Sequence, residues 1–140
     1  SDRSIFKIVD LDEAWAFLNV AQGETLSNKL VRAGRAMNAG VYFVTQSSGD
    51  VSKESLKNNI GLKFAFRSTD TNEIKQTLEF FGLDSEDENN QKRLRDLENG
   101  QCLMQDLYGR VGVVQIHPVF VELLHAFDTR PPIKSEVDLE

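Results

Sequence analysis

The chain has 140 residues, which suits one domain with its own hydrophobic core but not two. A composition that is 40% hydrophobic and 27% charged is typical of a soluble globular protein, and a net charge of -6 argues against a surface built mainly to bind nucleic acid. No apolar run approaches the roughly 20 residues of a membrane span, and the start lacks a signal-peptide pattern. The single Cys102 has no partner for an internal disulfide or a zinc site, so we expect a cytoplasmic protein.

The stretch 5–15 is a mostly apolar, β-prone run that ends in two adjacent acids, Asp12 and Glu13. This pattern is typical of a Walker B strand, in which the first acid holds the Mg²⁺ of a nucleotide through water. The second acid orients or deprotonates the attacking water. An ordinary strand that runs into a capped loop has the same pattern, and the stretch alone leaves both interpretations open.

Helices and strands are then expected to alternate. Residues 14–19 predict a short helix that Gly23 breaks, and Thr25 is placed to cap a longer helix. Three apolar residues recur near helical spacing within it: Leu26, Leu30 and Met37. Residues 38–40 are expected to end this helix, with Gly40 in the left-handed cap position.

Two short apolar runs predict further strands. Residues 41–45 lack alternation, which is typical of a strand buried on both faces of a parallel sheet. Residues 62–66 predict a third buried strand, closed by Arg67. Between them we expect a polar loop at 47–50 and a modest helix at 51–58.

Asp70 and Glu73 have the spacing of a capping box, which predicts the start of another helix. Its apolar face is expected to carry Ile74, Leu78 and Phe81. Gly82 is expected to end it.

The rest of the chain predicts smaller elements. Residues 84–90 are expected to be an acidic, solvated loop, and residues 91–97 a short helix. Residues 101–107 and 110–116 flank Tyr108-Gly109 and predict a β-hairpin with a tight turn.

Pro118 suits the first turn of a last helix. Four apolar residues could pack from this helix: Phe120, Leu123, Leu124 and Phe127. Residues 131–140 are expected to be a disordered tail, whose last two residues could be a cloning remnant.

This order predicts an α/β fold with a mostly parallel central sheet, flanking helices and a C-terminal β-hairpin. Ligands of such sheets meet the carboxyl ends of the strands. Asp12, Glu13, Gln46 and Arg67 follow the predicted strands. We therefore expect them at one edge of the sheet, which favours a nucleotide site.

A neutral amide such as Gln46 can bridge a γ-phosphate and the attacking water without adding charge. A loop glutamine that bonds to backbone is the open alternative. Arg32 and Arg35 lie three apart on one helical face and could reach phosphates of a neighbouring subunit, because a guanidinium matches phosphate oxygens. Arg67 and Arg110 are similar candidates, and each arginine could instead be a solvated surface charge.

A series of short stretches carries a family resemblance: Asp12-Glu13-Ala14-Trp15, Gly34-Arg35, Thr45-Gln46-Ser47, Asn59-Ile60-Gly61, Phe64-Ala65-Phe66-Arg67, Gly100-Gln101-Cys102-Leu103 and Asp106-Leu107-Tyr108-Gly109-Arg110-Val111-Gly112. In order and spacing they resemble the C-terminal part of the motor domain of VirB-four/TraC-type ATPases. These are the conjugation and type IV secretion ATPases of the FtsK/HerA branch of RecA-like P-loop NTPases. The resemblance runs from residue 6 to residue 130, so we expect residues 1–130 to be part of such a domain.

The resemblance implies a hexameric motor, peripheral to the inner face of the cell membrane, that hydrolyses ATP with Mg²⁺. It implies a type IV secretion channel and coupling proteins as partners; DNA is a further possible partner that the net charge does not support. Asp12 matches the acid that holds Mg²⁺, Glu13 the catalytic glutamate and Gln46 the γ-phosphate sensor.

The arginines that match recurrent family positions, and so are candidate arginine fingers, are Arg35, Arg67 and Arg110.

The sequence also departs from the family. It contains no Gly-x-x-x-x-Gly-Lys-Ser/Thr, the Walker A loop that binds phosphates, and Lys7 and Asp10 interrupt an opening strand that is more apolar in most relatives. We expect the full-length protein to be an ATPase, and this piece alone to be inactive and to self-associate where the Walker A half is missing.

Two alternatives stay open. One is an FtsK/HerA-like ATPase that pumps DNA, and the other is a non-catalytic interaction module of a secretion complex.

Overall fold

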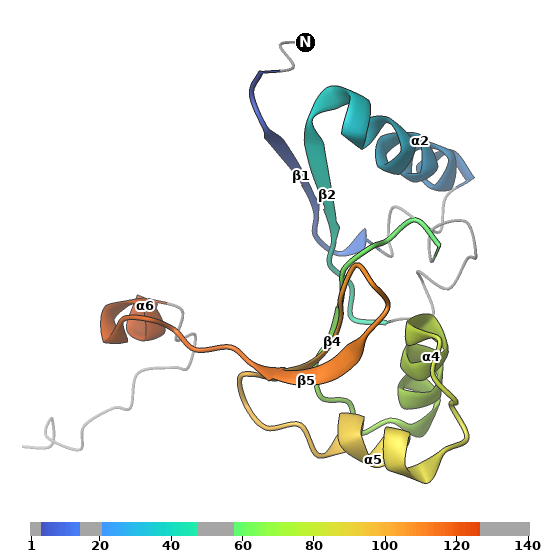
Figure 1. Ribbon diagram of the computed structural model, residues 1–140, viewed down its shortest axis with the longest axis vertical. Helices are drawn as coiled ribbons and strands as arrows, with labels where there is room; N and C mark the ends of the chain where they lie inside the picture. Colours follow the sequence, from blue (N-terminus) through green and yellow to red (C-terminus); the bar gives the residue numbers. More distant parts are fainter. Residues whose placement is uncertain (1–3, 15–20, 48–57, 127–140) are drawn as a thin grey trace, which may run out of the picture.

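Two sheets with different strand pairing organise the fold (Figure 1). The computed structural model describes residues 4–14, 21–47 and 58–126. Strands β1 (Lys7–Leu11) and β2 (Ala39–Phe43) are parallel, with Val9 opposite Val41. A parallel pair needs a long crossover, and helix α2 (Ala21–Met37) lies within it. The predicted α/β class is confirmed.

The second sheet is antiparallel and three-stranded, in the order β3 (Lys63–Ala65), β4 (Gln101–Gln105), β5 (Val111–Gln115). We expected β3 to extend the parallel sheet, but in the described part of the chain it pairs with β4, where Phe64 lies opposite Met104. A three-residue strand carries no information on its neighbour, so the sequence could not distinguish these pairings.

Helix α4 (Thr71–Phe81) has both predicted ends. The Asp70 carboxylate accepts a 2.9 Å hydrogen bond from the backbone N–H of Glu73, and Gly82 ends the helix with φ 73°. A left-handed φ favours glycine, which has no Cβ to clash. The predicted helix start at Asp70 and the glycine stop are therefore confirmed.

Helix α5 (Glu88–Arg95) begins earlier than expected. The side chain of Asp87 accepts a 2.8 Å hydrogen bond from the N–H of Asn89, which makes Asp87 the N-cap. The predicted loop at 84–90 therefore ends inside a helix, because an N-cap acid looks like any other acid in a polar run.

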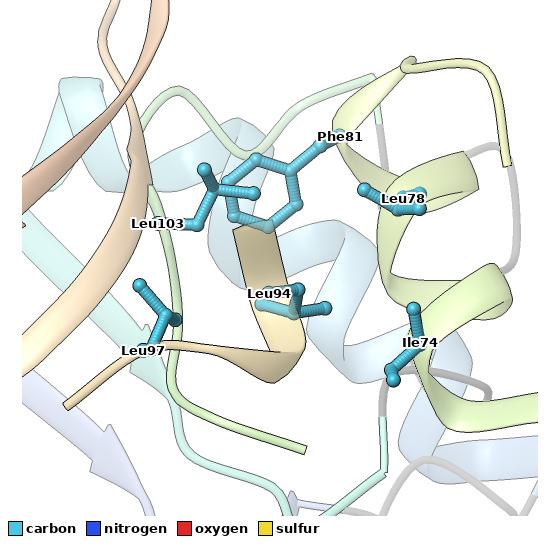
Figure 2. Packing of buried hydrophobic residues seen from close by; sticks show 6 residues of the cluster. All are labelled: Ile74, Leu78, Phe81, Leu94, Leu97 and Leu103. Carbon is cyan, nitrogen blue, oxygen red and sulfur yellow. The ribbon is translucent and has the colours of Figure 1, made fainter. Parts of the chain in front are cut away.

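The main core lies between these two helices and β4. Its buried members are Ile74, Leu78, Phe81, Leu94, Leu97 and Leu103. Figure 2 shows their side chains converging from α4, from α5 with the segment after it, and from β4. The apolar face predicted for residues 74–81 is therefore the face that builds this core.

Three predictions about the region of helix α2 are wrong. Gly23 and Thr25 lie inside it, so neither breaks nor caps it in the described residues. A helical glycine costs only about 1 kcal/mol, so one glycine does not by itself end a helix. At its end, Asn38 rather than Gly40 takes the left-handed conformation, with φ 52°. Gly40 lies in β2, where an added Cβ would be 3.2 Å from the ring of Phe6.

The β4–β5 hairpin is confirmed, with Gly109 at φ 78° in its turn. The short helix α6 (Val121–Ala126) follows Pro118. Its expected packing is wrong for the described residues, since Phe120 is 65% exposed and Leu124 is 54% exposed. Figure 1 shows α6 extending away from the two sheets. The spacing of the apolar residues predicted the helix correctly, but it could not predict whether another part of the chain packs against it.

Other predictions lie wholly or mostly outside the described residues: the helices at 14–19 and 51–58, the loop at 47–50, the packing of Phe127 and the tail at 131–140. No helix in the described ranges is both long and apolar enough to cross a membrane.

Phe80 joins the two halves of the structure. It packs against the main core and also against a second cluster around the buried Ala14, to which Val31 and Phe43 contribute. Lys63 donates a 3.0 Å hydrogen bond to the carbonyl of Phe80 and lies 4.8 Å from the centre of its ring. The end of α4 therefore contacts β3 of the antiparallel sheet and the cluster at the carboxyl end of the parallel sheet.

Candidate functional site

The end of β1 is held against the end of β2 by backbone hydrogen bonds. The N–H of Val44 donates to the carbonyl of Leu11 at 3.0 Å, and the N–H of Ala14 donates to the carbonyl of Val44 at 2.9 Å. These bonds extend the parallel pairing beyond the strands. They hold Asp12 and Glu13 in a tight turn at the carboxyl edge of the sheet.

The turn itself has an unusual backbone. Glu13 has φ 51°, a region that residues other than glycine seldom adopt. Oδ1 of Asp12 accepts a 2.9 Å hydrogen bond from the N–H of Glu13, which stabilises this conformation. Both acids are exposed, so the turn presents two carboxylates to solvent beside β2.

Gln46 completes the contact. Its Nε2 donates a 3.0 Å hydrogen bond to Oε1 of Glu13. Three sequence-predicted residues, Asp12, Glu13 and Gln46, therefore lie together at the ends of two adjacent parallel strands. An amide beside a carboxylate can bind one water together with it, because the carboxylate accepts from that water and the amide can donate to it or accept from it.

The loop that carries Gln46 is fixed on both sides. Oγ1 of Thr45 donates to the carbonyl of Ser47 at 3.2 Å and accepts from its N–H at 3.3 Å. Oγ of Ser47 donates to Oε2 of Glu73 at 3.3 Å. Neither Ser47 nor Glu73 is among the site residues predicted from the sequence. Glu73 had only the signal of a capping box, which does not point to a contact with another loop.

The candidate arginines lie on other elements: on α2, after β3 and in the β4–β5 hairpin. Arg67 is exposed after β3 and forms no hydrogen bond with Glu13 or Gln46, and Arg32 is exposed on α2. The backbone of Arg35 lies in α2, and its side chain is outside the described part of the structure. The expectation that Arg67 would lie with the acids rested on β3 joining the parallel sheet.

Arg110 is paired within its own hairpin. Its Nε donates to Oδ2 of Asp106 at 2.6 Å, and its guanidinium lies 5.4 Å from the ring centre of Tyr108. Partial burial alone would raise the pKa of Asp106, but hydrogen bonds from Arg110 and Tyr108 and the positive charge of Arg110 outweigh burial and lower this pKa.

Lys7, which interrupts the apolar pattern of β1, has a structural partner. Its Nζ donates to the carbonyl of Met37 at 3.3 Å and to that of Ile5 at 3.0 Å. Met37 ends α2, and a positive charge is favourable at the C-terminus of a helix. Lys7 therefore ties the start of β1 to the end of α2.

Carboxylates at this edge suit a hard cation bound through water. One oxygen of Asp12 is engaged by the N–H of Glu13, and within the described ranges no hydrogen bond or ion pair occupies the other oxygen. No group of three or more Asp, Glu, His or Cys side chains gathers as a closed metal site among the described residues. The other carboxylate oxygen of Asp12 can therefore accept from a water molecule bound to a cation.

Comparison with known proteins adds a family. Residues 1–127 match the family model described as "AAA-like domain". The uncharacterized protein YddE of Bacillus subtilis (strain 168) is 34% identical over 119 residues. That match covers 85% of this chain and 14% of YddE, so the chain spans a small part of this relative.

A solved structure is also similar. It is the genome packaging NTPase B204 from Sulfolobus turreted icosahedral virus 2 in complex with ATP-gammaS, with a TM-score of 0.61 and 15% identity. The match covers 79% of this chain and 52% of that chain. At this level of identity the likeness shows a shared fold.

Proposed function

We propose that this chain, which belongs to the family of AAA-like domains, is part of an ATP-hydrolysing motor that powers conjugative transfer or type IV secretion. The family and the NTPase fold support an ATPase or NTPase class. The transport role rests on the order of short motifs that resembles VirB-four/TraC-type ATPases. A hexamer, a peripheral position at the inner membrane face and secretion-channel partners belong to the same proposal.

The contact between Glu13 and Gln46 carries the catalytic part of this proposal. Parallel strands bring the two side chains to one edge, and the 3.0 Å bond from Nε2 to Oε1 holds them together. In this role Glu13 orients or deprotonates the attacking water. Gln46 holds that water and a γ-phosphate oxygen through its neutral amide.

Asp12 is the residue that would hold Mg²⁺ through water. The ion would arrive with ATP and would supply positive charge against the charge that develops on the phosphate. Asp12 also accepts from the backbone N–H of Glu13, so it fixes the turn that presents the catalytic carboxylate.

Phosphate binding requires residues that this sequence lacks. None of its glycines begins a Gly-x-x-x-x-Gly-Lys-Ser/Thr motif. We propose that the Walker A loop is supplied by another part of the full-length protein and that residues 1–140 alone hydrolyse no ATP.

The test is Glu13→Gln in the full-length protein, with Glu98→Gln as a matched control on an exposed loop. Loss of a general base typically lowers kcat by about 10²- to 10⁴-fold. We expect such a loss for Glu13→Gln, with nucleotide binding retained and transfer abolished, and no effect of the control.

Wild-type ATP hydrolysis by Glu13→Gln would disprove the catalytic assignment. Loss of hydrolysis with normal DNA transfer and normal protein secretion would keep the ATPase and reject the secretion role. Strongly salt-dependent DNA binding by the full-length protein would instead favour a DNA pump.

A further inference from the structure

We propose that Ser47 and Glu73 are positioning residues of the ATPase site, which together hold the loop after β2 so that Gln46 faces Glu13. The inference rests on the proposed function. It is supported by a different contact from the one between Glu13 and Gln46. Oγ of Ser47 donates a 3.3 Å hydrogen bond to Oε2 of Glu73, which lies 26 residues further along the sequence.

The loop leaves Gln46 little backbone freedom. Val44, before it, exchanges backbone hydrogen bonds with the end of β1, and Thr45 bonds to both the N–H and the carbonyl of Ser47. Thr45 and Ser47 are half-buried, whereas Gln46 is exposed. The flanking side chains thus anchor the loop, and the side chain between them reaches the catalytic carboxylate.

Glu73 is fixed by helix α4. Its N–H donates to the capping carboxylate of Asp70, and the next residue, Ile74, is fully buried in the main core. A hydrogen bond to a carboxylate is stronger than one between neutral groups. The second sheet and its helices therefore provide a rigid support for the loop through Ser47.

This support affects catalysis through geometry. A catalytic side chain must stay within about 0.5 Å of its productive position, and Gln46 has several rotatable bonds. Without the contact to Glu73, the loop keeps its backbone bonds to β1 but loses the Ser47–Glu73 hydrogen bond that joins it to α4. The expected effect is on kcat, because neither Ser47 nor Glu73 is proposed to touch the nucleotide.

The test measures ATP hydrolysis by the full-length protein with Ser47→Ala and Glu73→Ala. A displacement of about 1 Å can cost on the order of 10²-fold in rate, and for this partial loosening we expect roughly a tenfold fall in kcat with unchanged KM. Ser47→Thr keeps a hydroxyl and Glu73→Gln keeps an acceptor oxygen, so both variants should restore most of the rate.

The same helix offers a matched control. Oγ of Ser85 donates to Oε1 of Glu79 at 3.2 Å, a serine–glutamate bond near the C-terminal end of α4. Ser85→Ala and Glu79→Ala should leave kcat unchanged. If they lower kcat as much as the variants at Ser47 and Glu73, the effect is general loosening of α4 and the proposal is wrong.

A double variant tests the route. In a Gln46→Ala background, Ser47→Ala should cause no further loss, because its effect acts through Gln46. Equal losses in both backgrounds would overturn the proposal. Since Ser47 lies outside α4, this comparison holds even if Glu73→Ala unfolds the helix.

The two hypotheses fail differently. If Glu13→Gln abolishes hydrolysis while Ser47→Ala and Glu73→Ala keep wild-type kcat, the motor stands and the positioning role is wrong. If Glu13→Gln hydrolyses ATP normally, the catalytic assignment of Glu13 fails and the positioning role with it.

Discussion

The side-chain amide of Gln46 donates a 3.0 Å hydrogen bond to the carboxylate of Glu13, across 33 residues of sequence. Removing this amide should leave the fold intact, because Gln46 is exposed. For Gln46→Ala in the full-length protein we expect kcat to fall by about 10²-fold, the usual cost of losing one positioned donor. Steady-state ATPase assays measure this, and Gln76→Ala, at an exposed site on α4, should have no effect.

The predictability of this contact has a geometric reason. Parallel strands end at the same edge of a sheet, so the residues that follow β1 and β2 had to be close. The bond between Ser47 and Glu73 had no such signal. It depends on where α4 lies relative to the end of β2, and that position follows from packing around residues such as Phe80 rather than from a local pattern.

Capping residues and glycines predicted the ends of α4 correctly but not those of α2. Asp70 and Gly82 act at the ends of α4 as expected, because a cap needs only its own turn of helix. Gly23 lies inside α2 despite its low helix propensity, since one glycine costs a helix interior only about 1 kcal/mol and does not by itself end the helix. The partner of β3 was not predictable either, because its three residues fit a parallel or an antiparallel neighbour.

Leu78 is fully buried in the main core (Figure 2), so truncating it should create a cavity. We expect Leu78→Ala to lower the free energy of unfolding by about 2–5 kcal/mol. Urea denaturation followed by circular dichroism measures the change. Val119→Ala is the control, because Val119 is 79% exposed, and its effect should stay within about 0.5 kcal/mol. Similar losses for both variants would contradict the assignment of the core.

Gly82 and Gly112 test the role of backbone conformation. An added Cβ would meet no atom within 4 Å at either site, but only Gly82 has a positive φ, 73°. We expect Gly82→Ala to destabilise the chain by about 1–2 kcal/mol, the cost of a left-handed alanine. Gly112→Ala, in β5, should be neutral or stabilising. Because neither site is crowded, thermal melts of both variants measure the cost of the positive φ at Gly82. Equal losses of stability would contradict the strain argument.

The hairpin turn should respond to acid through Asp106. Because its pKa is lowered in the folded chain, its contribution to stability is fully present above the unfolded-state pKa of about 3.9. The contribution is lost as pH falls through the folded-state pKa. The stability difference between wild type and Asp106→Asn should therefore narrow on acidification from pH 7 to about pH 3. A difference that is constant with pH would show that the charge of Asp106 contributes nothing.

Phe80 packs against both hydrophobic clusters, and Lys63 of the antiparallel sheet donates to its carbonyl. If either sheet separates from the end of α4, the ring of Phe80 loses part of its cover, although the other sheet still contacts it. Local opening of one sheet is therefore penalised by the other, which couples them into one cooperative unit of unfolding. Amide hydrogens in β1 and β4 should consequently exchange with solvent through the same global event, although the two strands share no hydrogen bond.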